Sequence, residues 1–460
     1  MTTAPQGLLA GWLTEQRWFA GKGHAIDDLS IDSLTEIRPG DPGLVHLIVS
    51  VRQADRRTRY QLLAGLRAEL PERLKHVLIG TCRWPGEDER YLYDAAHDAA
   101  LTSDLLAGMA GGLRVGDLAF HRVPGTDIDT GQRSLVLTAE QSNTSLVYGD
   151  RYILKLFRQL TPGTNPELEI VTGLAAAGSV HVARPYGWIE APVGDDPPGK
   201  EPTTLAIMQE FLSNAGDGWT MALTSVRDLY ASPEDVPAEE AGGDFAAESF
   251  RLGTATAEVH RQLAEVFPTG TIEPADIKRL TELFRRRLDQ AVAEVPALGE
   301  HADVAGRAFD RLAELGHGVP VQRVHGDYHL GQVMRTPVDW VVLDFEGEPG
   351  QPLAERRALD SPLRDVAGML RSFDYAARHL LADHPEAASL EGRALEWSTR
   401  NRAAFLAGYT EGGGHIRGDD AVLLRALELS KAVYEVVYES RNRPAWLPIP
   451  LAAFAGSRDS

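Results

Sequence analysis

Two kinds of hydrophobic pattern divide the chain into a strand-rich part and a helix-rich part. Runs such as HLIVSVRQ (46–53) and RYQLLAGL (59–66) are short and rich in strand-favouring residues. Residues 249–267 and 277–295 instead repeat apolar side chains every three or four positions, which is typical of helices with one buried face. The pattern predicts an α+β protein with most strands first and most helices last.

The order of these patterns predicts three parts. Residues 1–90 open with the amphipathic segment LLAGWLTEQRWFAGKG, whose aromatic residues Trp12, Trp18 and Phe19 are expected to bury against a sheet. Residues 91–208 contain an expected helix at 91–110 and then strands. Residues 209–460 are mainly helical, and a loop rich in Pro, Gly and Asp precedes the strand at 205–212, where we expect the connection between lobes.

A β-hairpin is predicted where the runs QVMR and WVVLD flank the turn TPVD. Counting back from the turn pairs Arg335 with Trp340 and places Gln332 opposite Leu343, one residue before Asp344. Opposed residues of a ladder lie roughly 4.5 to 5.5 Å apart. The open end of the hairpin therefore brings an amide oxygen and a carboxylate close enough to share a cation.

These residue types suit phosphoryl transfer. The reaction needs a hard cation held by oxygen ligands, and a carboxylate that orients the attacking hydroxyl and accepts its proton. Gln332 and Asp344 can supply the first, and Asp327, in the irregular loop before the hairpin, can supply the second. An aspartate before a turn is commonly only a cap, so it is the combination that predicts a site for magnesium and phosphate.

The same segment carries a family resemblance. HGDYHLGQ followed by VVLDFEGEP resembles the catalytic loop and metal segment of the aminoglycoside-phosphotransferase-like kinases, in which HGD, four residues and Asn are usual. Gln332 replaces that Asn and adds one methylene. The longer run DFEGEPGQPLAERRALDSPLRDVAGMLRSFDYAA resembles the bacterial maltokinases, which phosphorylate maltose at its reducing end. The resemblance implies a bilobal, protein-kinase-like fold with an added N-terminal cap subdomain.

A lysine–glutamate pair is expected on the nucleotide side. Lys155 shares a strand face with two large apolar side chains, so its ammonium requires an anionic partner. Asn165 is a good N-cap for the helix that follows. Glu167 lies in its first turn, where it complements the helix dipole. Glu169 is deeper in the helix, and we expect it to pair with Lys155, as in the Lys–Glu pair of kinases.

Two further segments are assigned to ATP by the resemblance. The polar hairpin tip at 140–145 matches the phosphate-covering loop and otherwise reads as an ordinary turn. Backbone groups at the end of the strand 205–212 are expected to hold the adenine edge, although a buried core strand fits this run equally well. The residues concerned are Ser142, Asn143, Thr144, Ser145, Gln209, Glu210 and Phe211.

A sugar platform is predicted on the last long helix, at 421–437. Lys431, Tyr434 and Tyr438 fall at i, i+3 and i+7 and so share one face. Aromatic rings can cover the apolar face of a sugar while polar groups engage its hydroxyls. The alternative is a tyrosine-rich packing face.

Charged residues after the hairpin extend the expected site. Of Glu346 and Glu348, one assists metal or substrate binding and the other pairs with Arg356 or Arg357. Arg364 and Arg371 either position carboxylates near the site or form surface ion pairs, which contribute little. We include Glu346 and Arg364 among the expected substrate residues. His260 is expected to be a partner-bonded core histidine, because no second metal ligand accompanies it at helical spacing.

Composition narrows the class of protein. At 460 residues with 43% hydrophobic and 24% charged side chains, the chain has an ordinary globular composition. A net charge of −20 argues against a nucleic-acid partner and favours a neutral substrate such as a sugar. The single cysteine, Cys82, excludes an intramolecular disulfide and suits a reducing cytosol. No apolar run long enough to span a membrane is present, so we expect a cytoplasmic protein.

Taken with the resemblance, these residues predict an ATP- and Mg²⁺-dependent kinase that converts maltose to maltose 1-phosphate. Asp327 would deprotonate the anomeric hydroxyl and His325 would brace the catalytic loop. The resemblance also implies a role in α-glucan synthesis from trehalose and a possible complex with trehalose synthase. Two alternatives stay open, namely a kinase for another sugar such as glucosamine, and a catalytically silent nucleotide-binding protein.

Overall fold

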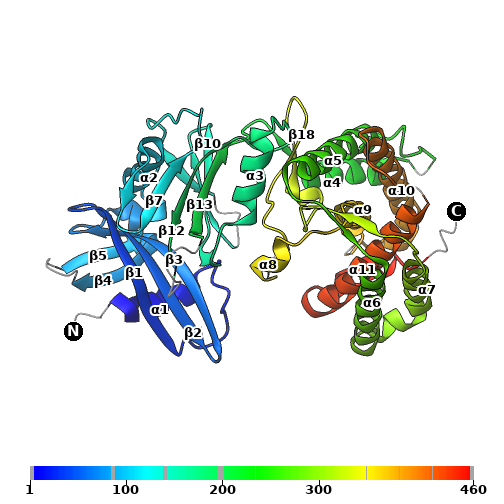
Figure 1. Ribbon diagram of the computed structural model, residues 1–460, viewed down its shortest axis with the longest axis horizontal. Coiled ribbons are helices and arrows are strands. Elements are labelled where there is room, and N and C mark those ends of the chain that lie inside the picture. The colour runs from blue at the N-terminus through cyan, green and yellow to red at the C-terminus, as the bar shows by residue number, and fades with distance from the viewer. Residues whose placement is uncertain are drawn as a thin grey trace. The chain divides into compact units, whose positions relative to one another are not determined.

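The computed structural model describes residues 5–83, 89–137, 142–193, 201–233, 235–348, 350–382, 384–416 and 418–455. The chain forms two compact units (Figure 1). The first comprises Met1–Thr172 and Ala183–Ser213, and the second comprises Gly173–Val182 and Asn214–Ser460. Apart from Gly173–Val182, the segments expected as cap and intermediate lobe lie in the first unit, which ends five residues beyond the expected boundary at 208.

The cap portion of the first unit is an antiparallel sheet with the strand order β1-β2-β3-β5-β4 and with β11 beside β3. α1 (Pro5–Glu15) contacts β1 and β4. Trp18 and Phe19 are buried in the core beside this sheet, as expected, and the partly buried Trp12 packs against the same core. The strands are β1 Asp28–Arg38, β2 Gly43–Gln53, β3 Arg56–Arg67, β4 Leu78–Arg83, β5 Glu89–Asp94 and β11 Gln159–Leu160.

A second sheet of the same unit has the order β6-β7-β12-β13-β10-β9-β8. The long apolar strand β13 lies between β12 and β10 because it is buried on both sides, whereas the shorter strands lie at the edges. Its strands are β6 Arg114–Val115, β7 Leu118–Arg122, β8 Ser134–Leu137, β9 Thr144–Tyr148, β10 Tyr152–Leu156, β12 Pro185–Ala191 and β13 Thr203–Glu210. The associated helices are α2 Ala99–Gly111 and α3 Pro166–Ala176.

The predicted helix at 91–110 is partly wrong. Residues Tyr91 to Tyr93 belong to β5, and α2 begins only at Ala99, after Asp98 accepts a hydrogen bond from the Ala100 N–H. The aromatic side chains at 91 and 93 favour a strand locally. Pairing of β5 with β3 and β4 satisfies that preference.

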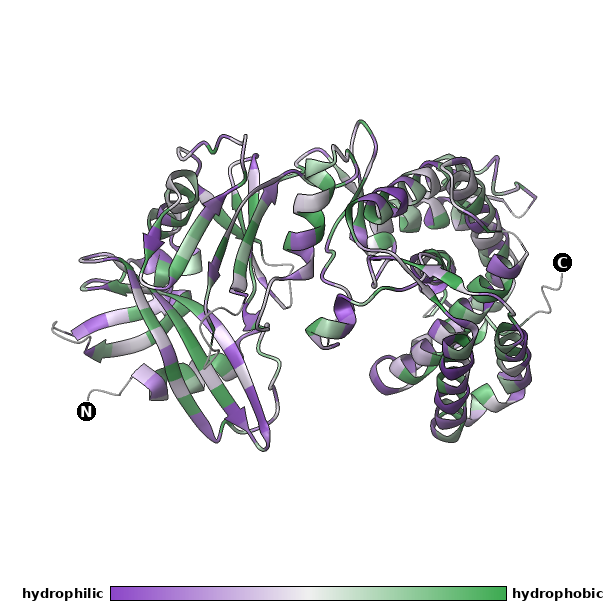
Figure 2. Cartoon of the chain, viewed as in Figure 1, coloured by the Kyte–Doolittle hydropathy of each residue, from purple (hydrophilic) through white to green (hydrophobic). Residues whose placement is uncertain are grey.

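The second unit is mainly helical (Figure 1). Its helices carry hydrophilic and hydrophobic residues on different faces, as amphipathic helices do (Figure 2). The two expected helices at 249–267 and 277–295 are α5 and α6. The helices are α4 Gly218–Ala231, α5 Ala246–Val266, α6 Pro274–Glu294, α7 Ala302–Ala313, α8 Leu353–Arg356, α9 Leu363–His379, α10 Ala387–Glu411, α11 Asp419–Asn442 and α12 Pro448–Leu451.

The predicted hairpin is confirmed in its register. β17 (Val333–Arg335) pairs with β18 (Trp340–Val342), with Arg335 opposite Trp340 and Val333 opposite Val342. β14 (Gly216–Asp217) extends this small sheet, and β15 (Gly270–Ile272) pairs with β16 (Val319–Val321). Within the described ranges, no helix has both the length and the apolar character needed to cross a bilayer.

Candidate functional site

The loop that carries Asp327 is held by His325. The Nε2–H of His325 donates to the Leu343 carbonyl at 2.7 Å, and the Asp327 backbone N–H donates to His325 Nδ1 at 3.3 Å. One ring nitrogen must therefore be protonated and the other must carry a lone pair, which is the neutral imidazole. His325 thus connects the loop to the segment that follows β18.

Asp365 supports the same loop from the start of α9. Its two carboxylate oxygens accept the backbone N–H groups of His325 at 2.7 Å and of Gly326 at 2.9 Å. Gly326 has φ = 85°, a conformation that favours glycine and turns its N–H toward Asp365. Burial by itself raises the pKa of the Asp365 carboxyl, but the hydrogen bond and charge of His260, with the further contacts, hold it below its ordinary value.

His260 has the partner-bonded role expected of it. Its Nε2 lies 3.2 Å from Asp365 Oδ2, and its Nδ1 lies 3.0 Å from the Tyr409 hydroxyl. All three side chains are buried. α5, α9 and α10 are therefore joined beneath the catalytic loop by one polar chain.

Gln332 and Asp344 face each other as the hairpin register predicts. The Gln332 amide lies 3.3 Å from Asp344 Oδ2, and the Leu343 N–H donates to the Gln332 carbonyl. Asp344 has φ = 60°, a strained conformation for a residue with a side chain. A carboxylate oxygen of Glu346 lies within 4.8 Å of one of Asp344. Hard oxygen donors of this kind suit Mg²⁺, and rotation of the Gln332 amide would turn its oxygen toward such an ion.

The expected sugar platform lies beside Asp327. The Lys431 ammonium is 4.0 Å from Asp327 Oδ1. The rings of Tyr434 and Tyr438 stack at 6.3 Å between centroids, and these residues are 56% and 43% exposed. Partial burial and the nearby Glu348 carboxylate raise the pKa of Tyr434. Both tyrosine rings are thus exposed on this face of α11, and the sugar platform stays a prediction.

The charged residues after the hairpin fall into distinct pairs. Arg356 Nη1 donates to the Glu346 carbonyl and lies 3.9 Å from its carboxylate. Arg364, which is partly exposed, pairs with Asp360 at 2.7 Å and with Glu348 at 3.3 Å. Positioning of the Glu348 carboxylate by Arg364 agrees with the first of the two expected roles.

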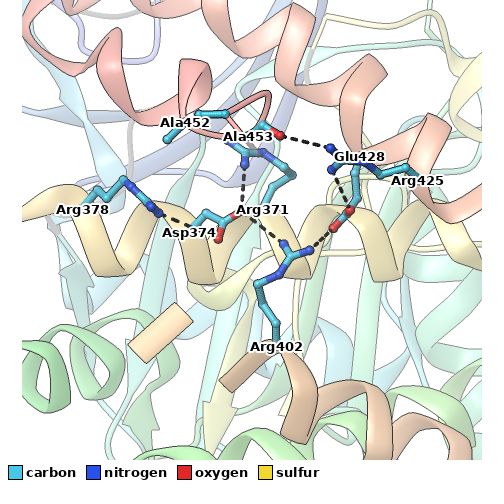
Figure 3. A pocket seen from close by; sticks show the side chains of 9 residues that line it. Arg371, Asp374, Arg378, Arg402, Arg425, Glu428, Ala452 and Ala453 are labelled. Atoms are coloured by element: carbon cyan, nitrogen blue, oxygen red, sulfur yellow. Dashed lines mark hydrogen bonds and ion pairs between the residues drawn. The ribbon is translucent and has the colours of Figure 1, made fainter. Parts of the chain in front are cut away.

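The surface-pair interpretation of Arg371 is wrong. This residue is 1% exposed and pairs with Asp374 at 2.9 Å and with Glu435 at 2.8 Å. Figure 3 shows it within a network that joins α9, α10 and α11, in which Arg402 contacts both Asp374 and Glu428. Because Glu435 follows Tyr434 in α11, this network fixes the helix face that carries the platform.

Lys155 contacts Glu167, the glutamate in the first turn of α3, and the expected pairing of Lys155 with Glu169 stays a prediction. Lys155 Nζ donates to Glu167 Oε2 at 3.0 Å, and Glu167 is 3% exposed. Asn165 caps α3 as expected by accepting the Glu167 N–H at 2.8 Å. The cap fixes the first turn beside β10, so the residue that looked like a dipole partner reaches the ammonium.

The expected phosphate loop is only partly described, since residues 140 and 141 lie outside the described ranges. Thr144 and Ser145 are buried in β9, and the Thr144 hydroxyl accepts a hydrogen bond from Arg158 at 2.8 Å. Hydroxyl contact of Thr144 with phosphate is therefore not supported. Ser142 is exposed and Asn143 half-buried, so these two remain candidates.

The adenine contact expected at the end of β13 stays a prediction, and two of its backbone N–H groups have partners within the first unit. The Glu210 N–H donates to the Arg184 carbonyl at 2.8 Å, and the Phe211 N–H donates to the Arg151 carbonyl at 2.9 Å. Gln209 is within the ladder opposite Ile153. The N–H groups of Glu210 and Phe211 are thus both engaged within the unit.

Comparison with known proteins places this geometry in a family. Residues 12–98 match the maltokinase N-terminal cap domain. Residues 135–406 match the phosphotransferase enzyme family. The chain belongs to the phosphotransferase enzyme family. It is a kinase with the aminoglycoside-phosphotransferase-like fold and a maltokinase-type cap, and the resemblance in the sequence is confirmed.

Individual relatives within the phosphotransferase family are named as glucosamine kinases. One from Streptacidiphilus jiangxiensis is 31% identical over 337 residues, covering 70% of this chain and 72% of the relative. One from Mycolicibacterium smegmatis (strain ATCC 700084 / mc(2)155) is 29% identical over 70% of this chain and 79% of the relative. The solved structure of a glucosamine kinase in complex with glucosamine, ADP and inorganic phosphate has a TM-score of 0.69 at 23% identity, covering 98% of this chain and 99% of that one, which shows a shared fold.

Proposed function

We propose that this phosphotransferase transfers the γ-phosphoryl group of ATP to the anomeric hydroxyl of maltose, giving maltose 1-phosphate. Asp327 orients the hydroxyl and accepts its proton as the sugar oxygen bonds to the γ-phosphorus. The bond from that phosphorus to the bridging oxygen breaks, and ADP leaves with the electron pair. His325 holds the loop in place and Lys155, paired with Glu167, binds the nucleotide phosphates. Gln332 and Asp344, with Glu346 nearby, would hold Mg²⁺, which neutralises phosphate charge when bound.

The charge balance around the platform supports a neutral acceptor. Asp327 lies beside Lys431, Glu348 beside Arg364, and Glu435 beside Arg371. Each of these carboxylates already has a Lys or Arg partner. To pair with one of them, the ammonium group of an amino sugar would have to displace that lysine or arginine side chain. A neutral disaccharide needs only hydroxyl donors and acceptors and an aromatic face, which Tyr434 and Tyr438 supply.

Phosphorylation of glucosamine is the second candidate, and the names of the relatives favour it. Maltose is neutral, whereas glucosamine carries an ammonium group. A direct comparison of the two as phosphate acceptors therefore decides between the candidates. Purified protein is assayed with ATP, Mg²⁺ and either maltose, glucose or glucosamine, with ADP release as the rate and phosphorus NMR to locate the new ester. We expect kcat/KM for maltose to exceed that for glucosamine at least tenfold. The reverse order overturns the proposed acceptor, and no turnover with any sugar returns the silent-protein alternative.

The proposal extends to the setting that the maltokinase resemblance implies. We propose a cytoplasmic enzyme that feeds α-glucan synthesis from trehalose and associates with trehalose synthase. Size-exclusion chromatography of the two proteins mixed at micromolar concentration tests the association. We expect co-elution, and separate elution at all ratios contradicts it.

A further inference from the structure

The C-terminal end of α11 holds an arginine in a fixed orientation beside the tyrosine platform. Glu439 is 1% exposed and accepts the Tyr375 hydroxyl at 3.1 Å. The same carboxylate accepts Arg443 Nη2 at 2.7 Å and Nε at 2.9 Å. A two-point contact of this kind fixes the plane of a guanidinium group as well as its position.

Two aromatic rings contact the same guanidinium group. Arg443 Cζ lies 4.1 Å from the ring centre of Trp446 and 5.5 Å from that of Tyr438. Tyr438 in turn stacks with Tyr434. Arg443 nevertheless keeps a side-chain exposure of 43%. An arginine that is both stacked and bidentate has lost most of its rotamer freedom before any ligand arrives.

One edge of this guanidinium remains available. Nε and Nη2 are used by Glu439, whereas across the described residues no hydrogen bond engages Nη1. Nη1 carries two N–H donors, and a sugar hydroxyl is a suitable acceptor for them. A fixed, partly exposed donor next to an aromatic face has the composition of a sugar subsite.

The position of this group along α11 sets its distance from the chemistry. Lys431, which lies beside Asp327, and Tyr438 are seven residues apart, which is about 10 Å along a helix axis. Tyr434 lies between them, and Arg443 and Trp446 continue the row beyond Tyr438. This row of side chains, from Lys431 to Trp446, is therefore longer than one sugar ring whose reacting hydroxyl lies at Asp327.

We propose that Arg443, clamped by Glu439 and stacked on Trp446, forms an outer subsite that donates Nη1–H to a hydroxyl of the second sugar ring. The site then selects an acceptor of two or more sugar units over a monosaccharide. This inference rests on the proposed function, since it assumes that the platform beside Asp327 binds the acceptor. It names Arg443 as a specificity-determining residue.

The test compares single and double sugars in matched variants. Arg443→Ala removes the hydrogen-bond donor. Arg443→Lys keeps the positive charge but lacks the planar guanidinium group. Arg441→Ala is the control, because Arg441 is in the last turn of α11 and makes a two-point contact with Glu294 instead. Steady-state kinetics are measured with maltose and glucose, and with the glucosamine dimer and glucosamine. Thermal melts report folding.

For Arg443→Ala we expect KM for maltose to rise at least tenfold with kcat within twofold, and kinetics with glucose to stay unchanged. Arg443→Lys should not restore the KM, and Arg441→Ala should match the wild type.

Equal loss with one-ring and two-ring acceptors, or no change with maltose, overturns the subsite. If the wild type uses only amino sugars, the proposed function fails, while an Arg443-dependent preference for the dimer still supports the subsite. A wild-type preference for monosaccharides in both classes overturns it.

Discussion

Asp327 carries the reaction in the proposed mechanism, and His325 accepts a hydrogen bond from its backbone N–H. Asp327→Asn keeps the shape of the side chain and removes its ability to accept a proton. We expect kcat to fall by about 10²- to 10⁴-fold, the usual contribution of a general base. ATP affinity, measured by calorimetry, should stay within twofold. The control is Asp303→Asn, which changes an exposed acid in the first turn of α7. A near-wild-type kcat in Asp327→Asn would show that Asp327 is not the general base.

The two glutamates of α3 provide a matched pair for the nucleotide side. Glu167→Gln leaves the Lys155 ammonium without the carboxylate 3.0 Å away, and an amide cannot replace that charge. We expect kcat/KM for ATP to fall on the order of tenfold or more, because loss of one partner from a buried ion pair is costly. Glu169→Gln should have the smaller effect. Equal effects of the two substitutions would show that the contact between Lys155 and Glu167 does not set nucleotide binding.

At the level of elements, α5 and α10 approach closely because glycines face the partner backbone. A Cβ at Gly408 would overlap the Phe250 carbonyl oxygen, and a Cβ at Gly253 would overlap that of Phe405. The buried Phe405 and Tyr409 lie on the same stretch of α10. This contact sets the position of Tyr409 and, through it, of His260 beneath the catalytic loop.

Gly408→Ala tests this contact. We expect it to lower the free energy of unfolding by about 1–3 kcal/mol, the usual cost of overpacking, and to reduce kcat. Gly392→Ala in the same helix is the control, because nothing lies within 4 Å of its missing Cβ. That change should be neutral or stabilising by up to about 1 kcal/mol, since alanine is the better helix former. Urea denaturation of the two variants measures the difference, and similar curves would contradict the packing argument.

Local sequence predicted elements well where the signal was itself local. The turn TPVD and its flanking strands gave the register of β17 and β18, and Asn165 gave the start of α3. The strand at Tyr91–Tyr93 was missed because a run of alanines downstream favours helix, while pairing with β3 and β4 decides. Asp365 is not among the residues singled out from the sequence, although an acid in the first turn of α9 is a signal that could have identified its role.

At the scale of the whole molecule, the cap and the strands that follow it share buried polar contacts. His46 Nε2 lies 3.0 Å from Gln61 Oε1, and the Gln61 amide donates to the Phe157 carbonyl at 2.9 Å. Arg158, also buried, pairs with Asp94 at 2.8 Å. Because such groups are costly to bury without partners, the cap is part of the folded unit.

Acid should therefore destabilise this unit through His46. Burial lowers the pKa of His46 from 6.5 to about 4, against a smaller opposing effect of Gln61. A histidine with a lowered folded-state pKa binds its proton preferentially in the unfolded chain. Its contribution is thus complete above pH 6.5 and is lost as the pH falls toward 4, by roughly 3 kcal/mol in total.

The measurement is thermal and urea unfolding of the wild type and His46→Gln at pH 7.5 and pH 5. We expect the wild type to lose more stability between the two pH values than the variant, which cannot be protonated at this position. Equal losses would show that other groups govern the acid sensitivity.

By itself, the sequence determined the α+β class, the hairpin register, the helix face of Lys431, Tyr434 and Tyr438, and the family. These depend on periodicity, turn chemistry and short motifs, all of which act between near neighbours in the chain. Tertiary structure alone decided that Glu167 lies against Lys155 and that Arg371 is buried. It also decided that the Arg443 guanidinium contacts the rings of both Tyr438 and Trp446. Such choices depend on which distant backbone arrives beside a side chain, and no local pattern contains that information.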